Sequence, residues 1–326
     1  MKTRCMVAMG CVLGIAHVSA HAQGFMLATS VNTDLIIRYR HPTGQAMDLY
    51  ASGLLGVLDG PSDMAVGPDG MLYVCAYNSD AVVRFDLDTG ENMGVFVTTG
   101  SGGLNGPAGM LFLPDGTLLV ASYGNHRILR YDSQGLPLGR FDSGALAPNL
   151  PIGLALGPDG NVYVASSGTD AVLRYNATTG VYMDSFIAAG TGGLDAPTDL
   201  LFRDDGRLYV LSGNTDSVLR YDAVTGAFVS VFVPARTGGM DLPHGIAEDD
   251  DGTLYIASRL SNQVLKFDGV SGAFTGIFAT TALNGVYSVL FVDEEKGGCP
   301  GDFNGNGVVD SQDFFDFLSS FFTPCP

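Results

Sequence analysis

The chain has 326 residues, 46% of them hydrophobic, and a formal net charge of −18 at pH 7. Such an acidic surface repels nucleic acid and anionic lipid, so a partner bound through a phosphate backbone is not expected. The 45 glycines and 15 prolines are spread among alternating apolar runs. This composition favours an all-β protein with many turns.

The first residues have the features of a secretory signal peptide. Lys2 and Arg4 precede an apolar run at 5–18, which is too short to span a bilayer comfortably. The sequence AHA, which ends at Ala22, then fits the small-x-small cleavage rule. We therefore expect residues 1–22 to be removed and the mature chain to be secreted, periplasmic or held at the cell surface. No later run reaches transmembrane length, so no transmembrane segment is expected.

A repeated turn organises the rest of the chain. The triplet PDG stands at 68–70, 114–116 and 158–160, and the related triplet DDG stands at 204–206 and 250–252. The steps between these triplets are 46, 44, 46 and 46 residues. A fixed period of this length is typical of a solenoid, a propeller or an array of repeats.

Each repeat predicts four short strands joined by tight turns. In the clearest copy they are GLAL (153–156), VYVAS (162–166), VLRYN (172–176) and a strand after Gly180. A glycine at the position of Gly180 recurs in every copy and supplies the positive φ that a tight turn requires. The continuous apolar run of the second strand predicts burial on both faces, and the alternation of the third strand predicts half exposure.

One repeat is divided between the two ends of the chain. MLATS (26–30) is a sixth copy of the second strand, whereas SVLF (288–291) is a sixth copy of the first strand. Joining the ends in one sheet closes a ring and removes the open sheet edges. The sequence therefore predicts an all-β, six-bladed β-propeller over residues 24–294, closed by N- and C-terminal strands.

The segments VYVAS and VLRYN around the PDG turn resemble the NHL-repeat propellers. They are also similar to relatives among the gluconolactonase (SMP-30) and virginiamycin B lyase families. The chain contains no Trp, so the Trp-Asp pairs of a WD-type propeller are absent. The resemblance implies the fold, because the residues that carry it form blades. Among these relatives, lactonase-type members hold a divalent metal on the axis with Glu, Asn and Asp side chains, and lyases use channel-face histidines.

The starts of the inner strands are expected to surround the central channel. One residue per blade lies at its mouth: Ser62, Ala108, Ile152, Thr198, His244 and Tyr287. The next ring is Asp63, Gly109, Gly153, Asp199, Gly245 and Ser288. Asp63 and Asp199 are three blades apart and are expected to face each other. With His244 they are the candidates for a divalent-metal or acid/base site, and the alternative is that the two carboxylates cap strands through backbone N–H groups.

The loops that differ between blades are the candidates for ligand binding. Three of them, at 98–107, 188–197 and 234–243, are long and rich in glycine. The candidate ligand residues on this channel face are Tyr77, Tyr123, His126, Arg236 and Arg259. His126 also occupies the position of Asp80, Asp170 and Asp216, which favours a turn residue. Two further residues are interpreted as structural, Cys75 as a small buried filler in a strand and His41 as part of a turn.

A second module follows a linker at 295–298. The loop at 302–313 has the spacing of an EF-hand-type calcium site. Its expected ligands are Asp302, Asn304, Asn306, the carbonyl of Val308, Asp310 and Asp313. Asp at the last position resembles the dockerin loop, and residues 314–322 would form the helix that follows. Dockerins carry two such loops and this chain has one; the alternative is a loop that binds no metal.

Two cysteines bracket this module at residues 299–326. Cys299 and Cys325 can form a disulfide in an oxidising compartment. The dockerin resemblance implies a cohesin-like or cell-surface partner for the module. A calcium ion is the only cofactor expected in this module, because carboxylate and amide oxygens suit a hard cation.

Three functions remain open on the sequence alone. The first is a monomeric, secreted, non-catalytic propeller that binds an extracellular protein or glycan through its channel face and is attached through the calcium-binding tail. The second is a metal-dependent lyase or lactone hydrolase that uses Asp63, Asp199 and His244 in the channel. The third is a component of a polysaccharide-degrading assembly.

Overall fold

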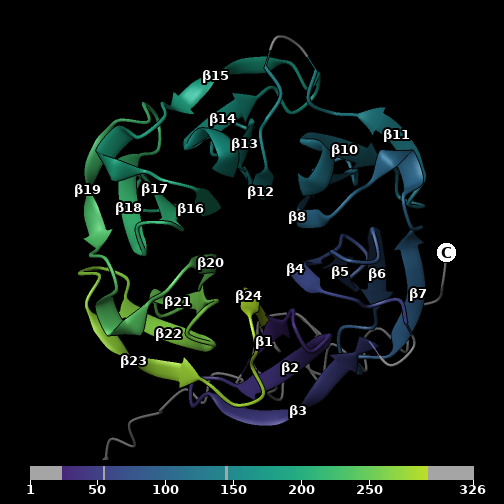
Figure 1. Ribbon diagram of the computed structural model, residues 1–326, viewed down its shortest axis with the longest axis horizontal. Coiled ribbons are helices and arrows are strands. Elements are labelled where there is room, and N and C mark those ends of the chain that lie inside the picture. Colours follow the sequence, from purple (N-terminus) through teal and green to yellow (C-terminus); the bar gives the residue numbers. More distant parts are fainter. Residues whose placement is uncertain (1–23, 54–55, 144–145, 293–326) are drawn as a thin grey trace, which may run out of the picture. The chain divides into compact units, whose positions relative to one another are not determined.

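The computed structural model describes residues 24–53, 56–143 and 146–292. Over this part of the chain, six four-stranded antiparallel sheets stand around a central axis like the blades of a propeller (Figure 1). The all-β, six-bladed prediction is therefore confirmed. No helix among the described residues is long and apolar enough to cross a membrane.

Several predictions concern other parts of the chain. The signal peptide at 1–22, the linker at 295–298 and the calcium module at 299–326, with its proposed Cys299–Cys325 disulfide, lie outside the described residues. They stay predictions.

Five blades are formed by strands that follow one another in the chain from the axis outwards. Blade 2 contains β4 (Pro61–Val66), β5 (Leu72–Ala76), β6 (Ala81–Phe85) and β7 (Asn92–Val97). Blade 3 contains β8 (Pro107–Phe112), β9 (Leu118–Ser122), β10 (Arg127–Tyr131) and β11 (Pro137–Arg140). Blade 4 contains β12 (Pro151–Leu156), β13 (Val162–Ser166), β14 (Ala171–Tyr175) and β15 (Tyr182–Ile187). Blade 5 contains β16 (Pro197–Arg203), β17 (Arg207–Ser212), β18 (Ser217–Asp222) and β19 (Phe228–Val233). Blade 6 contains β20 (Pro243–Glu248), β21 (Thr253–Ser258), β22 (Gln263–Asp268) and β23 (Phe274–Ala279).

Blade 1 joins the two ends of the propeller chain. Its inner strand is β24 (Val286–Val292), followed outwards by β1 (Phe25–Ser30), β2 (Leu35–Arg40) and β3 (Gln45–Ser52). β24 pairs antiparallel with β1, so that Phe25 lies opposite Val292 and Leu27 opposite Leu290. The predicted closure of the ring is confirmed, and the closed ring removes the open ends at which a sheet stack would otherwise be exposed.

The hydrophobic core lies between neighbouring blades. One cluster, for example, joins Leu119 and Ile128 of blade 3 to Val162 and Val164 of blade 4. The second strands are buried, as predicted, along their whole length in blades 1 to 4 and after the first residue in blades 5 and 6. The expected half exposure of the third strands was wrong: β14 is buried apart from the partly exposed Arg174. Exposure is concentrated in the outermost strands, which have solvent on one side: β7 and β15 alternate in burial, and β11 is exposed along its whole length.

A hydrogen bond between consecutive blades recurs around the ring. In each blade, the turn between the second and third strands contains a non-glycine residue with a left-handed backbone. Its side chain accepts a hydrogen bond from the backbone N–H of the residue just before the next blade. The six pairs are Asp34–Gly60, Asp80–Gly106, His126–Leu150, Asp170–Ala196, Asp216–Leu242 and Asn262–Gly285, with distances of 2.6–3.0 Å. His126 makes this contact through Nδ1, which confirms its interpretation as a turn residue.

Both backbone conformation and close packing require glycine in the last turn of each blade. Gly180 has a φ of +67°, and a Cβ atom there would lie 1.9 Å from the carbonyl oxygen of Phe141 in blade 3. Gly226 repeats the arrangement one blade later, 2.1 Å from the carbonyl oxygen of Phe186. A side chain at these positions would therefore strain the turn and separate adjacent blades.

The two residues interpreted as structural have structural contacts. Cys75 is fully buried in β5. The Nε2 atom of His41 lies 3.0 Å from Oδ2 of Asp249 and 2.9 Å from the hydroxyl of Tyr255, which connects blades 1 and 6. Both interpretations are confirmed.

We predict that Asp170→Ala lowers the free energy of unfolding by about 1–3 kcal/mol, because the N–H of Ala196 loses its acceptor. Asp170→Asn is the matched control. It keeps a carbonyl acceptor and a side chain that tolerates the left-handed backbone, as Asn262 does in blade 6. Urea unfolding of the three proteins measures the difference. Equal losses for Ala and Asn would contradict the role of the hydrogen bond.

Candidate functional site

Six residues, one from each inner strand, surround the mouth of the channel. They are the predicted ring of Ser62, Ala108, Ile152, Thr198, His244 and Tyr287, and all of them line one cavity. The hydroxyl of Ser62 donates to the carbonyl of Pro107 at 2.7 Å, and that of Thr198 donates to the carbonyl of Pro243 at 2.8 Å. These hydroxyl groups are thus used to hold neighbouring blades together.

The second ring narrows the channel. It contains Asp63, Gly109, Gly153, Asp199, Gly245 and Ser288, as expected from the repeat. A Cβ atom on Gly109 would lie 2.1 Å from the carbonyl oxygen of Ile152, so the blades approach at this point as closely as glycine permits. The cavity between the two rings has a volume of about 20 Å³, which is room for a single water molecule.

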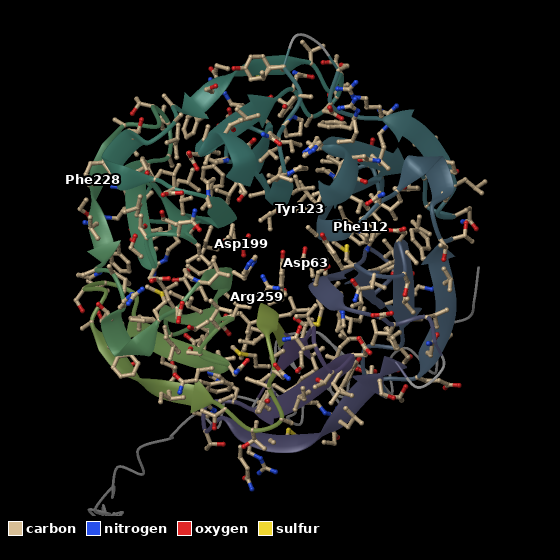
Figure 2. All side chains as sticks on the ribbon, in the orientation of Figure 1. Asp63, Phe112, Tyr123, Asp199, Phe228 and Arg259 are labelled. Atoms are coloured by element: carbon tan, nitrogen blue, oxygen red, sulfur yellow. The ribbon has the colours of Figure 1, made fainter. Side chains whose placement is uncertain are left out.

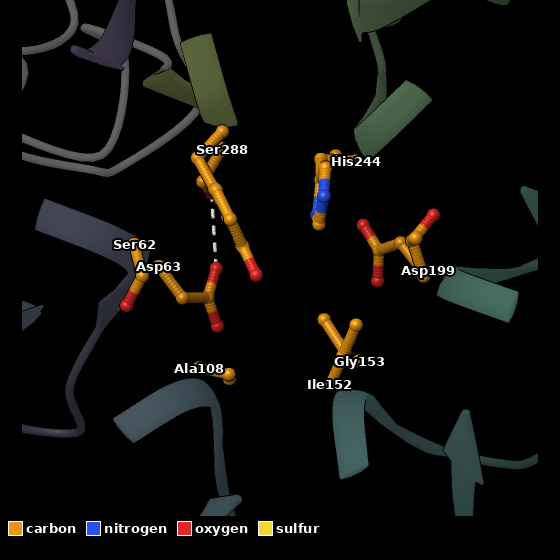
Figure 3. A pocket seen from close by; sticks show the side chains of 12 residues that line it. Ser62, Asp63, Ala108, Ile152, Gly153, Asp199, His244 and Ser288 are labelled. Atoms are coloured by element: carbon orange, nitrogen blue, oxygen red, sulfur yellow. Dashed lines mark hydrogen bonds between the residues drawn. The ribbon is translucent and has the colours of Figure 1, made fainter. Parts of the chain in front are cut away.

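Asp63 and Asp199 point toward each other across the axis (Figure 3). Asp63 accepts the backbone N–H of Met110 in blade 3 at 2.8 Å and the hydroxyl of Ser288 at 3.0 Å. Asp199 accepts the N–H of Leu200 at 2.8 Å and that of Ile246 in blade 6 at 3.0 Å. These are the backbone contacts that the strand-capping interpretation predicts.

Burial changes the acidity of both carboxyl groups. Removal from water raises the pKa of Asp63 to about 6 and the pKa of Asp199 to about 7. The charge of Asp63 raises the pKa of Asp199 further, whereas the N–H donors act in the opposite direction. The two groups are near enough to titrate as a pair, so near neutral pH the channel holds less than two full negative charges.

His244 is a neutral imidazole in this setting. Its ring stacks on Tyr287 with 3.9 Å between ring centres, and its Nδ1 atom has no hydrogen-bond partner among the described residues. Burial, followed by the charge of Arg259, lowers the pKa of His244 to about 3. A general-acid role for a protonated His244 is therefore disfavoured near neutral pH.

The protein itself already uses the two channel carboxylates as hydrogen-bond acceptors. All four carboxylate oxygens of Asp63 and Asp199 already accept hydrogen bonds from the protein. Within the described ranges, no three His, Cys, Asp or Glu side chains are grouped as a metal site would require. The axial metal that the resemblance to lactonases implied stays a prediction.

A larger cavity of about 280 Å³ opens above the channel. Tyr77, Tyr123, Tyr287 and Arg259 are among the residues that line it. Tyr77 and Tyr123 lie with ring centres 6.1 Å apart and planes inclined by 58°, and the guanidinium carbon of Arg259 lies 5.5 Å from the ring centre of Tyr287. In the view of Figure 2, Tyr123 and Arg259 are grouped around the central axis, as are Asp63 and Asp199, whereas Phe228 lies at the periphery. We call this cavity the mouth pocket.

The structure separates the predicted ligand residues into two groups. Tyr77, Tyr123 and Arg259 line the mouth pocket together. His126 and Arg236 do not line it: His126 supports the next blade, and Arg236 pairs with Asp216 at 3.0 Å. Sequence reasoning placed Tyr287 at the channel but did not identify it as a ligand residue. The available signal was that Tyr287 and His244 are the two residues with an aromatic side chain among the six residues at the channel mouth.

Comparisons with known proteins show the fold. No protein-family model matches the chain, and neither does any curated protein. A chain of the nidogen–laminin complex superposes with a TM-score of 0.66 at 16% identity, covering 82% of this chain and 98% of that one. A protein of unknown function from Bacteroides caccae gives 0.61 at 18% identity, covering 83% and 100%. Virginiamycin B lyase from Staphylococcus aureus gives 0.53 at 16% identity, covering 72% and 77%. At these identities the likeness shows the six-bladed propeller fold alone and gives no function.

We predict that Asp63→Asn lowers the pKa of Asp199, because it removes the neighbouring negative charge. In the unchanged protein, both folded-state pKa values lie above the ordinary value of 3.8. Between about pH 4 and pH 7 the folded state therefore binds more protons than the unfolded state, and the free energy of unfolding falls as pH rises. Carboxyl ¹³C NMR across this range measures the titration. Titration midpoints below about pH 4.5 for both groups in the unchanged protein would contradict the claim that burial raises their pKa values.

Proposed function

We propose that the protein is a secreted, non-catalytic propeller that binds an extracellular protein or glycan in the mouth pocket. The observation that carries the proposal is the set of polar groups there that the blades do not use. Within the described part of the chain, the hydroxyls of Tyr77, Tyr123 and Tyr287 and the guanidinium of Arg259 make no hydrogen bond or ion pair. Half-buried aromatic and Arg side chains of this kind are the usual anchors of a binding interface.

The C-terminal module supplies the second part of the proposal. The loop from Asp302 to Asp313 binds one calcium ion, and residues 299–326 attach the protein to a cohesin-like or cell-surface partner. The ligand spacing of the EF-hand-type loop and its likeness to dockerins support this step. The same likeness supports a place in a polysaccharide-degrading assembly as a further alternative.

A catalytic function at the axis is the second candidate. Two buried carboxyl groups with raised pKa values are a frequent feature of acid/base sites, which favours a lyase or lactone hydrolase. The cavity between them is too small for a substrate, at about 20 Å³. Catalysis there would require the channel to open. Turnover of a panel of lactones and cyclic depsipeptides by the full chain, lost in Asp199→Asn, would favour this candidate over binding.

We predict that Tyr77→Ala and Tyr123→Ala each reduce binding of the partner by about tenfold or more, because each removes a wall of the mouth pocket. Tyr182→Ala is the matched control, since Tyr182 lies on the outer strand β15. Biolayer interferometry against immobilised extracellular proteins and polysaccharides identifies the partner and measures the effect. A partner whose affinity falls with Tyr182→Ala but not with the other two variants would refute the location of the site.

We predict that calcium addition to the full chain changes the NMR signals of residues 299–326 and that Asp302→Ala abolishes the change. The carboxylate of Asp302 is the first ligand of the loop, and its loss removes charge that the cation needs. Isothermal titration calorimetry measures the binding heat. The propeller signals of residues 24–292 serve as the internal control and should not move. No heat and no shift in the unchanged protein would exclude a calcium site.

A further inference from the structure

We propose that the mouth pocket binds the carboxylate of an Asp or Glu side chain presented by a partner polypeptide, with Arg259 as the anion-binding residue. This inference rests on the proposed binding function and specifies the chemistry of its ligand. It follows from three features of the pocket: a fixed cation without a counter-ion, donors that remain available, and a volume that suits one side chain.

The guanidinium of Arg259 is held in place without a carboxylate partner. Arg259 follows β21 directly, and its backbone N–H donates to the carbonyl of Leu242 at 3.2 Å. Its guanidinium carbon lies 5.5 Å from the ring centre of Tyr287, a distance at which cation and ring attract each other. Arg236, on the same face, differs because it pairs with Asp216. Among the described residues Arg259 makes no ion pair, although the chain has 34 acidic residues and only 16 basic ones.

The positive charge of Arg259 is felt inside the pocket. It contributes to the lowered pKa of His244 and acts against the raised pKa of Tyr287. Arg259 is the one charged side chain among the described residues that line the pocket, because His244 is neutral there. Asp63 and Asp199 line the smaller cavity beneath and not the mouth pocket, although the charge of Asp63 also acts on Tyr287 and opposes that of Arg259 there. An anion entering the mouth pocket therefore meets Arg259 as the one charged side chain of the pocket lining, in a partly desolvated site.

The remaining polar groups of the pocket can bind a carboxylate. The hydroxyls of Ser62 and Thr198 already donate to backbone carbonyls, and the amide of Asn214 donates to Asp195 at 2.8 Å. The groups that stay available include the phenol hydroxyls, which can donate or accept, the guanidinium of Arg259, which can only donate, and the unpartnered Nδ1 atom of His244. A carboxylate is purely an acceptor and forms strong, charge-assisted hydrogen bonds with a guanidinium, and the phenol hydroxyls can donate to it as well.

The size of the pocket points to one protruding side chain. Its volume of about 280 Å³ is at the lower limit for sites that enclose a complete small ligand. Tyr77 and Tyr123 are inclined by 58° and do not form the flat platform on which a row of sugar rings could stack. A loop of a partner polypeptide that presents a single Asp or Glu fits this shape.

The test uses the full chain with ¹³C-labelled tyrosine rings and NMR titration. The probe is the acetylated peptide Gly-Ser-Glu-Ser-Gly, with the Gln peptide as its neutral counterpart and trigalacturonate as a carboxylate from a glycan. We expect the Glu peptide to shift the signals of Tyr77, Tyr123 and Tyr287 and to bind about tenfold or more tightly than the Gln peptide, since hydrogen bonds to a charged group are the stronger ones.

Variants locate the binding to Arg259. Arg259→Gln should weaken binding of the Glu peptide about tenfold or more, and Arg259→Lys should retain part of it. Arg236→Gln is the matched control, because Arg236 lies outside the pocket and should leave affinity unchanged. A superimposable amide spectrum shows that each variant is folded.

Several results would overturn the inference. They are equal binding of the Glu and Gln peptides, full binding by Arg259→Gln, tighter binding of trigalacturonate than of the Glu peptide, and no shift with any probe. Failure of this inference can be told from failure of the proposed function. If the partner found by interferometry depends on Tyr77 and Tyr123 but not on Arg259, the binding function stands and the carboxylate ligand is wrong.

Discussion

The ring depends on one hydrogen bond that is repeated at each junction between blades. A residue with a left-handed backbone, such as Asp170, directs its side chain at the N–H of a second left-handed residue just before the next blade, such as Ala196. Both backbones are constrained, so the bond fixes the angle at which one blade follows the last. Asn262 and Gly285 repeat the bond where the chain closes on itself. The ring therefore has no free end at which a blade could separate alone.

This constraint has a consequence for function. Residues that recur in all blades, among them the turn glycines and the left-handed residues, are used to build the ring. The residues that differ between blades meet at the axis, because every blade delivers the start of its inner strand there. The second ring, in which three closely packed glycines stand among larger residues, leaves little space in the channel itself. The aromatic residues and Arg259 line the larger mouth pocket. The rigid part of the molecule thus presents a preformed pocket at one face of the propeller, and preformed sites lose less entropy on binding.

The sequence contained most of the fold because its period is regular. The PDG and DDG triplets indicated five blades, and MLATS (26–30) with SVLF (288–291) indicated the sixth blade, which closes the ring. The ring of residues at the channel was likewise predictable, since each follows a blade-starting turn. Burial of the third strand was not, because it depends on the outer strand and the neighbouring blade rather than on local alternation.

Contacts between residues that are distant in the chain could not be predicted from the sequence either. Nothing in the pattern shows that all four oxygens of Asp63 and Asp199 are engaged, or that Tyr287 stacks on His244. The different roles of Arg236 and Arg259 likewise could not be predicted, because Arg236 forms an ion pair with Asp216, which is 20 residues away in the chain.

Together, the hydrogen bonds between blades hold the ring, and with it the mouth pocket, as one cooperative unit. Native-state hydrogen exchange at Gly60, Gly106, Leu150, Ala196, Leu242 and Gly285 tests this most directly. We expect all six amides to exchange only with global unfolding and at similar rates; fast exchange at one or two of them through local opening would contradict a cooperative ring.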